Sequence, residues 1–381
     1  MSDLPRVLVA HNRYRVEGGE ERAVELQLAA LGRAGVPHRA LFRDSGDAGR
    51  VRAAGALLAG GEAPELVARA VRDLRATVLH AHNMQPLLGP RSLAAARAAG
   101  ARVVLHLHNF RLFCAIGVAF RDGAPCFRCR GRSTLPGLVL NCRDSLAEAA
   151  VYAAALAAHQ PAVLAAVDRF VAPSGYAAGQ LARLGLPAER LSVLAHYLPA
   201  DALRERSRAD RGEFALVSAR LAPEKGVAVA IAAAASTGVA LKVTGDGPLA
   251  LELRELATRL RAPVEFLGRV EPRALAALRA RAALAVVPSQ SGETFGLTAL
   301  EAMGAGLPVV STDAGALPEI VGRERAVARG DVEALAAAID TLWRDPQRRR
   351  REGDDGIADA RERFGERRYM SDLLGLYRAL D

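Results

Sequence analysis

Short apolar runs alternate with longer segments of helical periodicity along the whole chain. In the first half, the runs predicted to be buried strands are Arg6–Ala10, Val78–His80, Val103–Leu107, Phe170–Ala172 and Ser192–Leu194. In the second half they are Phe214–Ser218, Leu241–Thr244, Val264–Leu267, Leu284–Pro288 and Pro308–Ser311. A helical segment follows each strand of the second half. This alternation is typical of doubly wound parallel sheets, so the pattern predicts an α/β protein with two Rossmann-like domains.

A polar stretch from Pro199 to Glu213 interrupts the alternation. We interpret residues 199–213 as a linker between an N-terminal domain, 1–198, and a C-terminal domain, 214–355. The chain ends in charged helical sequence, and we expect residues 356–381 to pack back on the N-terminal domain. Since 381 residues are enough for two ordinary domains, the length agrees with this division.

The loop after the first strand of the second domain combines two cations with a predicted helix start. Arg220 and Lys225 precede a helix that begins near Val227. Free N–H groups at a helix start attract anions, so this loop suits a phosphate. A solvated loop would explain it as well, but Lys225 is one of only two lysines among 51 basic residues.

A second polar loop, from Pro288 to Gly306, connects a buried strand to a helix. Glu293 lies in its turn, and Glu301 follows about two helical turns later. Carboxylates at such a place can accept hydrogen bonds from sugar hydroxyls. The alternative makes Glu293 a helix cap and Glu301 a surface charge.

These motifs follow one another in a specific order along the second domain. Arg220 and Lys225 precede a Gly-Asp-Gly-Pro turn, then Phe-Leu-Gly-Arg-Val, and then Glu293 with Glu301 eight residues on. The ordered set resembles family 4 retaining glycosyltransferases of the GT-B fold. The resemblance covers essentially the whole chain and is strongest from Phe214 to Val321. It implies two Rossmann-like domains facing a central cleft.

The resemblance also implies a donor substrate, a nucleotide-diphospho-sugar, with UDP- or GDP-sugars expected first. In such enzymes Arg220 and Lys225 would hold the diphosphate. Glu301 would bind the ribose, and Glu293 would bind the transferred sugar. The backbone near Val270 would contact the base. The diphosphate would also receive hydrogen bonds from the backbone amides of Phe295, Gly296, Leu297 and Thr298. Fixed donors of this kind stabilise a departing diphosphate without a catalytic metal, and the sequence has no Asp-x-Asp pair.

The first domain is expected to supply the acceptor side. Gly18 and Gly19 follow the first strand and resemble the glycine loop that the family places beneath the phosphates, although a turn with positive φ would also explain them. The family pattern matches His108, which with Glu293 would shape the reaction, and retention of configuration is implied. His80 and His82 either line the acceptor side or are structural, and His106 is expected to be a buried neighbour.

The four cysteines lie within 29 residues, in the predicted insertion of about 110–145. Their spacing is C-x11-C-x2-C-x12-C, and the ligands would be Cys114, Cys126, Cys129 and Cys142. Four thiolates can form a tetrahedral zinc site that orders a polar loop. Disulfides or unrelated thiols are the alternatives. A similar insertion occurs in a subset of the family.

Composition limits the remaining possibilities. Residues Met1 to Arg6 do not resemble a signal peptide and no run of about 18 apolar residues is uninterrupted, so we expect a soluble, cytoplasmic protein. The net charge of +9 favours anionic partners, including a membrane surface touched by helices such as 145–167. A sugar, a lipid-linked compound or a small molecule would be the acceptor.

Two other functions stay open at this stage. A nucleotide-sugar epimerase could use the same fold. A nucleic-acid-binding protein with a zinc module would explain the arginines and cysteines, but the arginines are dispersed among acidic residues and aromatic residues are only 4% of the chain.

Overall fold

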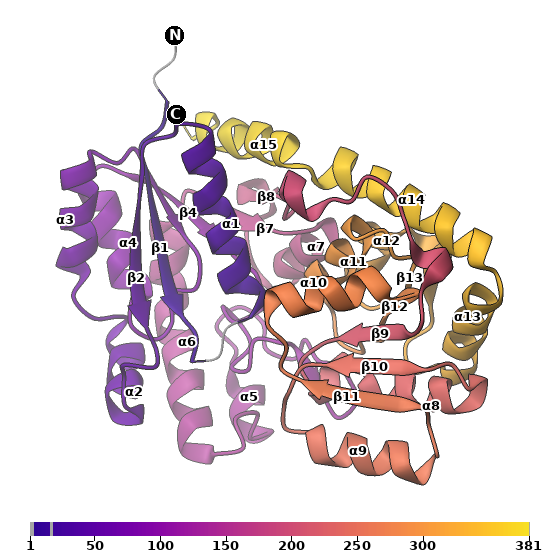
Figure 1. Cartoon of the computed structure of the whole chain (residues 1–381). Helices are drawn as coiled ribbons and strands as arrows, with labels where there is room; N and C mark the ends of the chain where they lie inside the picture. The colour runs from indigo at the N-terminus through magenta and orange to yellow at the C-terminus, as the bar shows by residue number, and fades with distance from the viewer. Residues whose placement is uncertain (1–3, 16–17, 381) are drawn as a thin grey trace. The chain divides into compact units, whose positions relative to one another are not determined.

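The computed structural model describes residues 4–15 and 18–380 and contains two six-stranded parallel sheets (Figure 1). The chain forms two compact units. The first contains the chain up to Ala119, residues Cys126–His196 and the residues from Tyr369 onward; the second contains Phe120–Pro125 and Tyr197–Arg368. The predicted α/β fold with two doubly wound sheets is confirmed.

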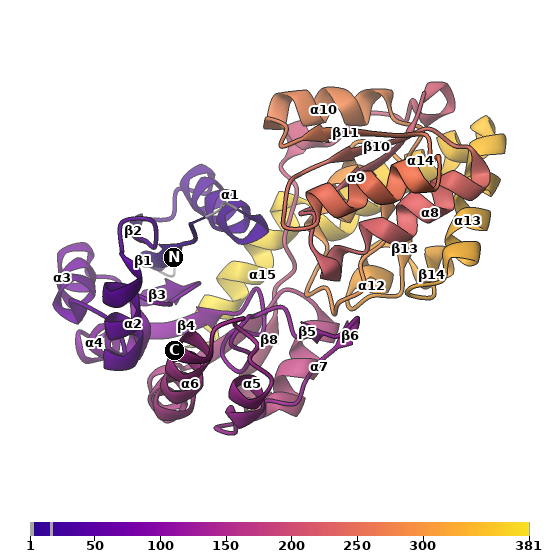
Figure 2. The same cartoon turned by 90° about the horizontal axis from the view of Figure 1, so that it is seen from below.

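The sheet of the first unit has the strand order β2-β1-β3-β4-β7-β8. Its strands are β1 (Val7–Arg13), β2 (His38–Asp44), β3 (Val78–Ala81), β4 (Arg102–His106), β7 (Arg169–Ala172) and β8 (Leu191–Val193). Its helices are α1 (Gly19–Arg33), α2 (Arg50–Ala59), α3 (Pro64–Leu74), α4 (Gly89–Ala98), α5 (Leu135–Val139), α6 (Leu146–Ala166) and α7 (Gly175–Leu184). Helices α3, α4, α6 and α2 pack on one another in succession (Figure 2).

The sheet of the second unit has the order β11-β10-β9-β12-β13-β14. Its strands are β9 (Ala215–Ser218), β10 (Leu241–Thr244), β11 (Val264–Gly268), β12 (Leu284–Val287), β13 (Val309–Thr312) and β14 (Ala326–Val327). Its helices are α8 (Val227–Thr237), α9 (Ala250–Arg259), α10 (Pro272–Arg281), α11 (Leu297–Gly304), α12 (Leu317–Val321), α13 (Val332–Arg344) and α14 (Pro346–Phe364). A two-stranded hairpin of β5 (Phe120–Arg121) and β6 (Ala124–Pro125) is separate from both sheets.

Each sheet contains one edge strand that the hydrophobic pattern does not predict. Strand β2 has three apolar residues, Ala40 to Phe42, between charged ones, and none of its residues is fully buried, because an edge strand is covered on fewer sides. Strand β14 has only two residues, too few to produce a pattern. Both were missed because the predictions relied on buried apolar runs.

The polar segment 199–213 belongs to the second unit in the structure. Ser207 is buried; its backbone N–H donates to Asp354 and its hydroxyl donates to the carbonyl of Gly306. The guanidinium of Arg349, on α14, donates to the carbonyls of Ala209 and Asp210. Hydrogen bonds of the segment's backbone and of the Ser207 hydroxyl therefore fix residues 199–213 to that unit.

The C-terminal helix α15 (Glu366–Arg378) contributes to both units. Residues up to Arg368 belong to the second unit, and those from Tyr369 belong to the first. The Tyr377 hydroxyl lies 2.7 Å from Nδ1 of His80 on β3, which fixes the end of this helix to the first sheet.

One described helix, α6, is long and apolar enough by composition to cross a bilayer. It packs against α2, α4 and α5 in the first unit.

Candidate active site

The first group of predicted residues lies at the carboxyl end of the second sheet, where the loops after β9 and β12 meet. Gly226 has φ of 63°, and a Cβ atom there would lie 2.0 Å from the carbonyl oxygen of Pro288. This close backbone approach brings Lys225 to Glu293: Nζ lies 2.5 Å from Oε1. The hydroxyl of Ser289 donates to the same oxygen at 2.7 Å. The structure therefore joins two residues that are 68 positions apart in sequence.

The ionisation of Glu293 follows from this pairing. Burial raises the pKa of its carboxyl group, but the charge of Lys225 and the hydrogen bonds from Lys225 and Ser289 outweigh burial, so the pKa is lowered overall. Glu293 is therefore an anion at neutral pH. Its side chain binds Lys225 and Ser289, and the N-cap of α11 is Gly296, without a side-chain cap. The helix-cap alternative is thus wrong.

Arg220 lies in the same loop after β9 as Lys225. Its guanidinium pairs with Glu224, whose side chain is buried, while the Arg220 side chain is 57% exposed. The Gly-Asp-Gly-Pro turn packs under this loop: Gly245 has φ of 119°, and a Cβ there would lie 1.9 Å from the carbonyl oxygen of Ala219. A buried carboxylate and a close backbone contact thus hold an accessible guanidinium in place.

The predicted amide donors lie at the start of α11, which begins at Leu297 after Gly296. The Phe295 side chain is buried against Phe364, with ring centroids 5.7 Å apart, so only its backbone can serve a ligand. Glu301 forms an ion pair with Arg279 of α10 rather than pointing free into solvent. Val270 is half-buried in the loop between β11 and α10.

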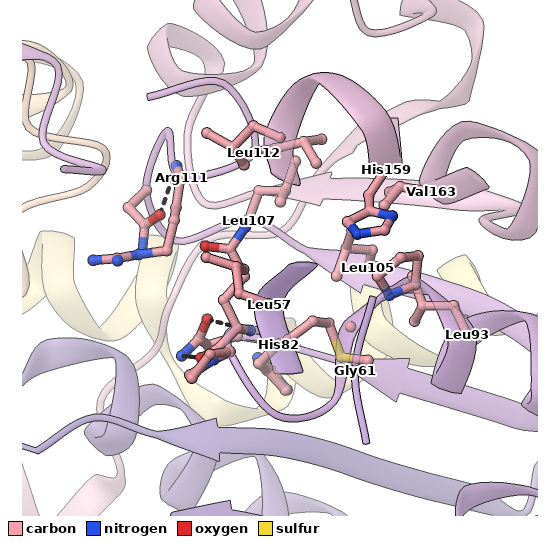
Figure 3. Close-up of a pocket in the computed structure, with 18 of the residues that line it drawn as sticks. Leu57, Gly61, His82, Leu93, Leu105, Leu107, Arg111, Leu112, His159 and Val163 are labelled. Carbon is pink, nitrogen blue, oxygen red and sulfur yellow. Dashed lines mark hydrogen bonds between the residues drawn. The ribbon is translucent and has the colours of Figure 1, made fainter. Parts of the chain in front are cut away.

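The first unit contains a pocket at the carboxyl ends of β3 and β4, covered by α6. Apolar side chains, among them Leu57, Leu93, Leu105, Leu107 and Leu112, form most of its wall (Figure 3). Its polar lining includes Tyr14, Glu20, His82, His106, His108, Asn109 and Arg111. The cavity holds about 80 Å³, well below the roughly 300–1,000 Å³ of typical ligand sites. It therefore admits one small group, such as a hydroxyl with its carbon.

Histidines from β3 and β4 form two hydrogen-bonded pairs that stack on each other. His82 Nδ1 lies 2.7 Å from His108 Nε2, and His80 Nε2 lies 3.4 Å from His106 Nδ1. The rings of His106 and His108 stack at 4.2 Å, and His196 stacks on His108 at 5.2 Å. His106 is the last residue of β4, and His108 follows two residues later. Their rings thus face the same side.

Burial keeps these imidazoles neutral. It lowers the pKa of His80 to about 3 and that of His196 to about 4. For His82, His106 and His108, burial and then the neighbouring imidazoles lower the pKa well below the usual value. His108 is therefore a hydrogen-bonding group at neutral pH and not a cationic acid.

The hydrogen bonds also assign the tautomers of one pair. Gln27 Nε2 donates to the Tyr377 hydroxyl oxygen at 3.3 Å, which directs the hydroxyl hydrogen to His80 Nδ1. His80 then donates from Nε2 to His106 Nδ1, so His106 carries its hydrogen on Nε2. Within the described residues this buried nitrogen has no partner. The Nε2 of His106 is thus a donor without an acceptor in the wall of the pocket.

Two sets of three histidines have ring nitrogens within 4.8 Å of one another: His80, His82 and His106, and His106, His108 and His196. Within these sets the ring planes differ by only 14° to 39°. A ring nitrogen directs its lone pair in its own plane, so three nearly parallel rings do not converge on one ion. We interpret the cluster as a hydrogen-bonded stack.

Two consecutive glutamates follow the glycine loop and have different environments. Glu21 accepts hydrogen bonds from the backbone N–H groups of Gly18 and Tyr14, at 2.9 and 3.0 Å. Glu20 lines the pocket, and its Oε2 accepts from the Tyr14 hydroxyl and from Asn109, at 2.9 and 3.0 Å. Burial raises the pKa of Glu20 to about 7. The sequence analysis assigned no role to Glu20, although its place after the glycine loop was a signal.

Of the predicted glycine loop, Val16 and Glu17 lie outside the described residues. Gly18 is the N-cap of α1 with φ of −147°, and Gly19 begins the helix. The explanation by a turn with positive φ is therefore wrong for both glycines. Gly18 presents its N–H to Glu21, so the described part of the loop orders the start of α1.

None of the four cysteines forms a disulfide, and all four are half-buried. Burial raises the pKa of Cys129 to about 11, and the thiolate charges of Cys114, Cys142 and Cys126 act in the same direction, so the four thiols lie near one another. The sets of three or more potential ligands within 4.8 Å in the described part of the chain contain histidines and none of these cysteines. Zinc binding by the four thiols stays a prediction.

Two doubly wound sheets, one with paired cations and carboxylates at its carboxyl end, define a GT-B glycosyltransferase. Residues 200–358 match the family described as Glycosyl transferases group 1, and residues 16–196 match the Glycosyl transferase 4-like domain. The chain belongs to the family 4 glycosyltransferases, and the predicted family is confirmed.

Curated relatives match parts of the chain. A GDP-mannose-dependent α-(1-6)-phosphatidylinositol dimannoside mannosyltransferase of Mycobacterium tuberculosis is 40% identical over 126 residues, 32% of each chain. Glycogen synthase of the same species is 38% identical over 164 residues, which is 40% of this chain and 37% of that enzyme. The matched part thus spans less than two-fifths of either relative.

Solved structures match the fold over nearly the whole length. Sucrose-phosphate synthase from Thermosynechococcus elongatus has a TM-score of 0.72 at 19% identity, covering 98% of this chain and 99% of that chain. Anabaena Alr3699/HepE in complex with UDP has a TM-score of 0.67 at 18% identity, covering 98% and 100%. At such identities the likeness shows the GT-B fold alone.

Proposed function

We propose that this enzyme transfers a hexosyl group from a nucleotide-diphospho-sugar to an acceptor hydroxyl, with retention of configuration and without a catalytic metal. The observation that carries this proposal is the Lys225–Glu293 pair beside Arg220 at the carboxyl end of the second sheet. Relatives that use GDP-mannose and fold neighbours that bind UDP or UDP-glucose support UDP- or GDP-sugars as donors.

The proposed roles follow from charge and position. Lys225 and Arg220 neutralise the diphosphate as it gains charge on leaving, with the amides at the start of α11. Glu293, ionised because of Lys225, accepts hydrogen bonds from hydroxyls of the transferred sugar. Glu301, fixed by Arg279, accepts from the ribose, and the backbone near Val270 contacts the base.

On the acceptor side, the pocket of the first unit receives the attacking hydroxyl. His108 and the donor nitrogen of His106 bind its oxygen, and the carboxylate of Glu20 accepts a hydrogen bond from it. The departing phosphate oxygen then takes the proton as the new glycosidic bond forms. The enzyme would act inside the cell on a sugar, a small molecule or a lipid-linked compound at the membrane surface.

Donor binding is tested by thermal shift with UDP-, GDP-, ADP- and dTDP-sugars. We expect one nucleotide to raise the unfolding temperature, and Glu301→Ala to weaken its binding about tenfold, because a hydrogen bond to a charged group contributes about 1.5–3 kcal/mol. Glu265→Ala is the matched control, since Glu265 also pairs with a cation, Lys242, but on strand β11 rather than on helix α11. Unchanged binding by Glu301→Ala would remove the assigned ribose site.

The reaction type is tested by NMR of the product. We expect the glycosidic linkage to keep the anomeric configuration of the donor, and an inverted linkage would refute the proposed retention. Incubation with a nucleotide-sugar alone separates the epimerase alternative, because an epimerase converts its substrate without an acceptor.

A further inference from the structure

A second, larger cavity in the first unit adjoins the small pocket. It forms a groove lined by α2, α6 and the loops after β1 and β4, and holds about 680 Å³. The two cavities share Tyr14, Leu57, Gln85, Pro86 and Arg111 as lining residues. Ligand sites typically measure about 300–1,000 Å³, so the groove can take the body of a substrate whose reacting group enters the small pocket.

The groove has an unbalanced positive charge. Among the residues that the structure describes, its lining contains Arg15, Arg50, Arg111 and Arg143, against a single acid, Glu148. Glu148 pairs with Arg143 at 3.0 Å. Even with that pair counted as neutral, three guanidinium groups remain at one cavity. Such a concentration of cations favours an anionic ligand, because low-dielectric walls strengthen their summed field.

Aromatic rings hold two of these guanidinium groups in place. Arg143 lies over the ring of Tyr152, with Cζ 4.3 Å from the centroid, and Arg111 lies over Tyr14 at 5.2 Å. The Nε atoms of both arginines are buried and lack an acceptor among the described residues. Guanidinium groups fixed in this way match the planar, two-point recognition of phosphate oxygens.

Most of the remaining groove is apolar, although Ser45, Gln85 and Ser145 also line it. Its wall includes Val51, Ala53, Ala54, Ala147 and Val151, from the facing sides of α2 and α6. Val51 is 88% exposed, and Leu146, at the start of α6, is 64% exposed. An apolar wall beside a cluster of cations suits a molecule with an alkyl chain and a phosphate.

We propose that this groove binds the phosphate and the first part of the alkyl chain of an amphiphilic phosphate ester, with Arg111 and Arg143 on the phosphate. This ligand would be the acceptor, and only that last statement rests on the proposed glycosyl transfer. Arg111 lines both cavities, so the phosphate would lie at their junction, with the acceptor hydroxyl in the small pocket beside Glu20.

The test uses the full-length chain with Arg220→Ala as the parent, so that the predicted diphosphate site does not bind the probes. The probes are inorganic phosphate, hexyl phosphate and hexyl glucoside, measured by isothermal titration calorimetry. We expect hexyl phosphate to bind at least about tenfold tighter than inorganic phosphate, since burying two methylene groups is enough for that factor. Hexyl glucoside should bind more weakly than hexyl phosphate.

Arg143→Gln should weaken hexyl phosphate binding about tenfold. Arg69→Gln, at an exposed position of α3 outside the groove, should leave it unchanged. Glu148→Gln should strengthen binding, because it frees Arg143 from a competing carboxylate. Glu148→Gln would not strengthen binding if Arg143→Gln weakened it only by disturbing the fold.

Three results would overturn the proposal: equal binding by Arg143→Gln and the parent, equal affinity for inorganic and hexyl phosphate, or hexyl glucoside binding as tightly as hexyl phosphate. The proposed transferase function fails separately, if no nucleotide-sugar binds the unmodified enzyme, and that failure would leave the phosphate result standing.

Discussion

Replacing Lys225 by alanine is expected to lower kcat/KM about 10²–10³-fold, the effect typical of removing one fixed donor from a developing negative charge. The variant loses the cation that we propose to face the diphosphate. It also leaves the buried carboxyl group of Glu293 without its ion-pair partner, so the pKa of Glu293 rises and less of it is ionised at neutral pH. Steady-state kinetics with the donor identified by thermal shift would measure the loss.

The other lysine of the chain is the matched control. Lys242 forms an ion pair with Glu265 at 2.8 Å and lies over the Phe214 ring, on strand β10 rather than in a loop of the site. Lys242→Ala should leave kcat/KM within about a factor of three, because surface ion pairs contribute only about 0–1 kcal/mol. If Lys225→Ala lost no more activity than Lys242→Ala, the assigned diphosphate site would be wrong.

A double substitution separates the stability contributed by the Lys225–Glu293 ion pair from the contributions of the two residues alone. In Lys225→Ala with Glu293→Gln, no uncompensated buried charge remains, so we expect a smaller loss of stability than in Lys225→Ala alone. Chemical denaturation of Lys225→Ala, of Glu293→Gln and of the double variant measures this coupling. The lowered pKa of Glu293 stabilises the folded state above the pKa of an unfolded glutamate, and this contribution disappears as the pH falls through the folded pKa.

Replacing Glu20 by glutamine should lower kcat/KM about 10- to 100-fold and remove the acidic limb of the pH profile. In the unmodified enzyme, activity should rise with pH through about 7. Over this range the carboxylate of Glu20 forms and can accept a hydrogen bond from the acceptor hydroxyl. The groups that face Glu20 are His11 on β1, Tyr14, Glu21, and Asn109 with Arg111 in the loop after β4. Burial is the main cause of its raised pKa, and the charge of Glu21 adds to it; His11 and Arg111 act in the opposite direction.

Stability should change in the opposite direction to activity. The folded pKa of Glu20 lies above the pKa of an unfolded glutamate, so ionisation of this buried group destabilises the folded state as the pH rises through about 7. Glu20→Gln should therefore unfold at a higher temperature than the unmodified enzyme at pH 8. A merely structural Glu20 would give the same gain in stability, because burial alone raises its pKa, but it would not give the altered pH profile of activity.

Glu21→Gln is the neighbouring control. Glu21 accepts backbone hydrogen bonds at the start of α1, so its replacement should cost about 1 kcal/mol of stability and keep the acidic limb. Loss of the limb in Glu21→Gln, or its persistence in Glu20→Gln, would contradict the assignment of Glu20.

The residues of the proposed donor site could be selected from the sequence because they belong to short motifs. Arg220, Lys225 and Glu293 each follow a strand of the same parallel sheet, and the carboxyl ends of such strands meet at one edge. Their partners could not be predicted in the same way. In the sequence, Glu224 and Arg279 look like ordinary charged residues of helices. Only the packing of the 3-10 turn Pro223–Lys225 pairs Glu224 with Arg220, and only the packing of α10 pairs Arg279 with Glu301.

The acceptor side was much harder to predict. His106 and His108 drew notice as an alternating pair, but their pairing with His80 and His82 depends on the register of β3 against β4. Glu20 and Glu21 are adjacent in sequence, yet one lines a pocket and the other binds backbone amides. Local sequence does not distinguish them, because their difference arises from contacts with Tyr14 and Asn109.

The sequence by itself determined the α/β alternation, the family, and the cation and carboxylate of the donor loops, because periodicity and short motifs are local properties. Only the tertiary structure decided which charges are paired, which histidines are neutral and which cavities adjoin each other. These depend on contacts between residues as far apart as His80 and Tyr377, where burial removes water and sets the protonation state.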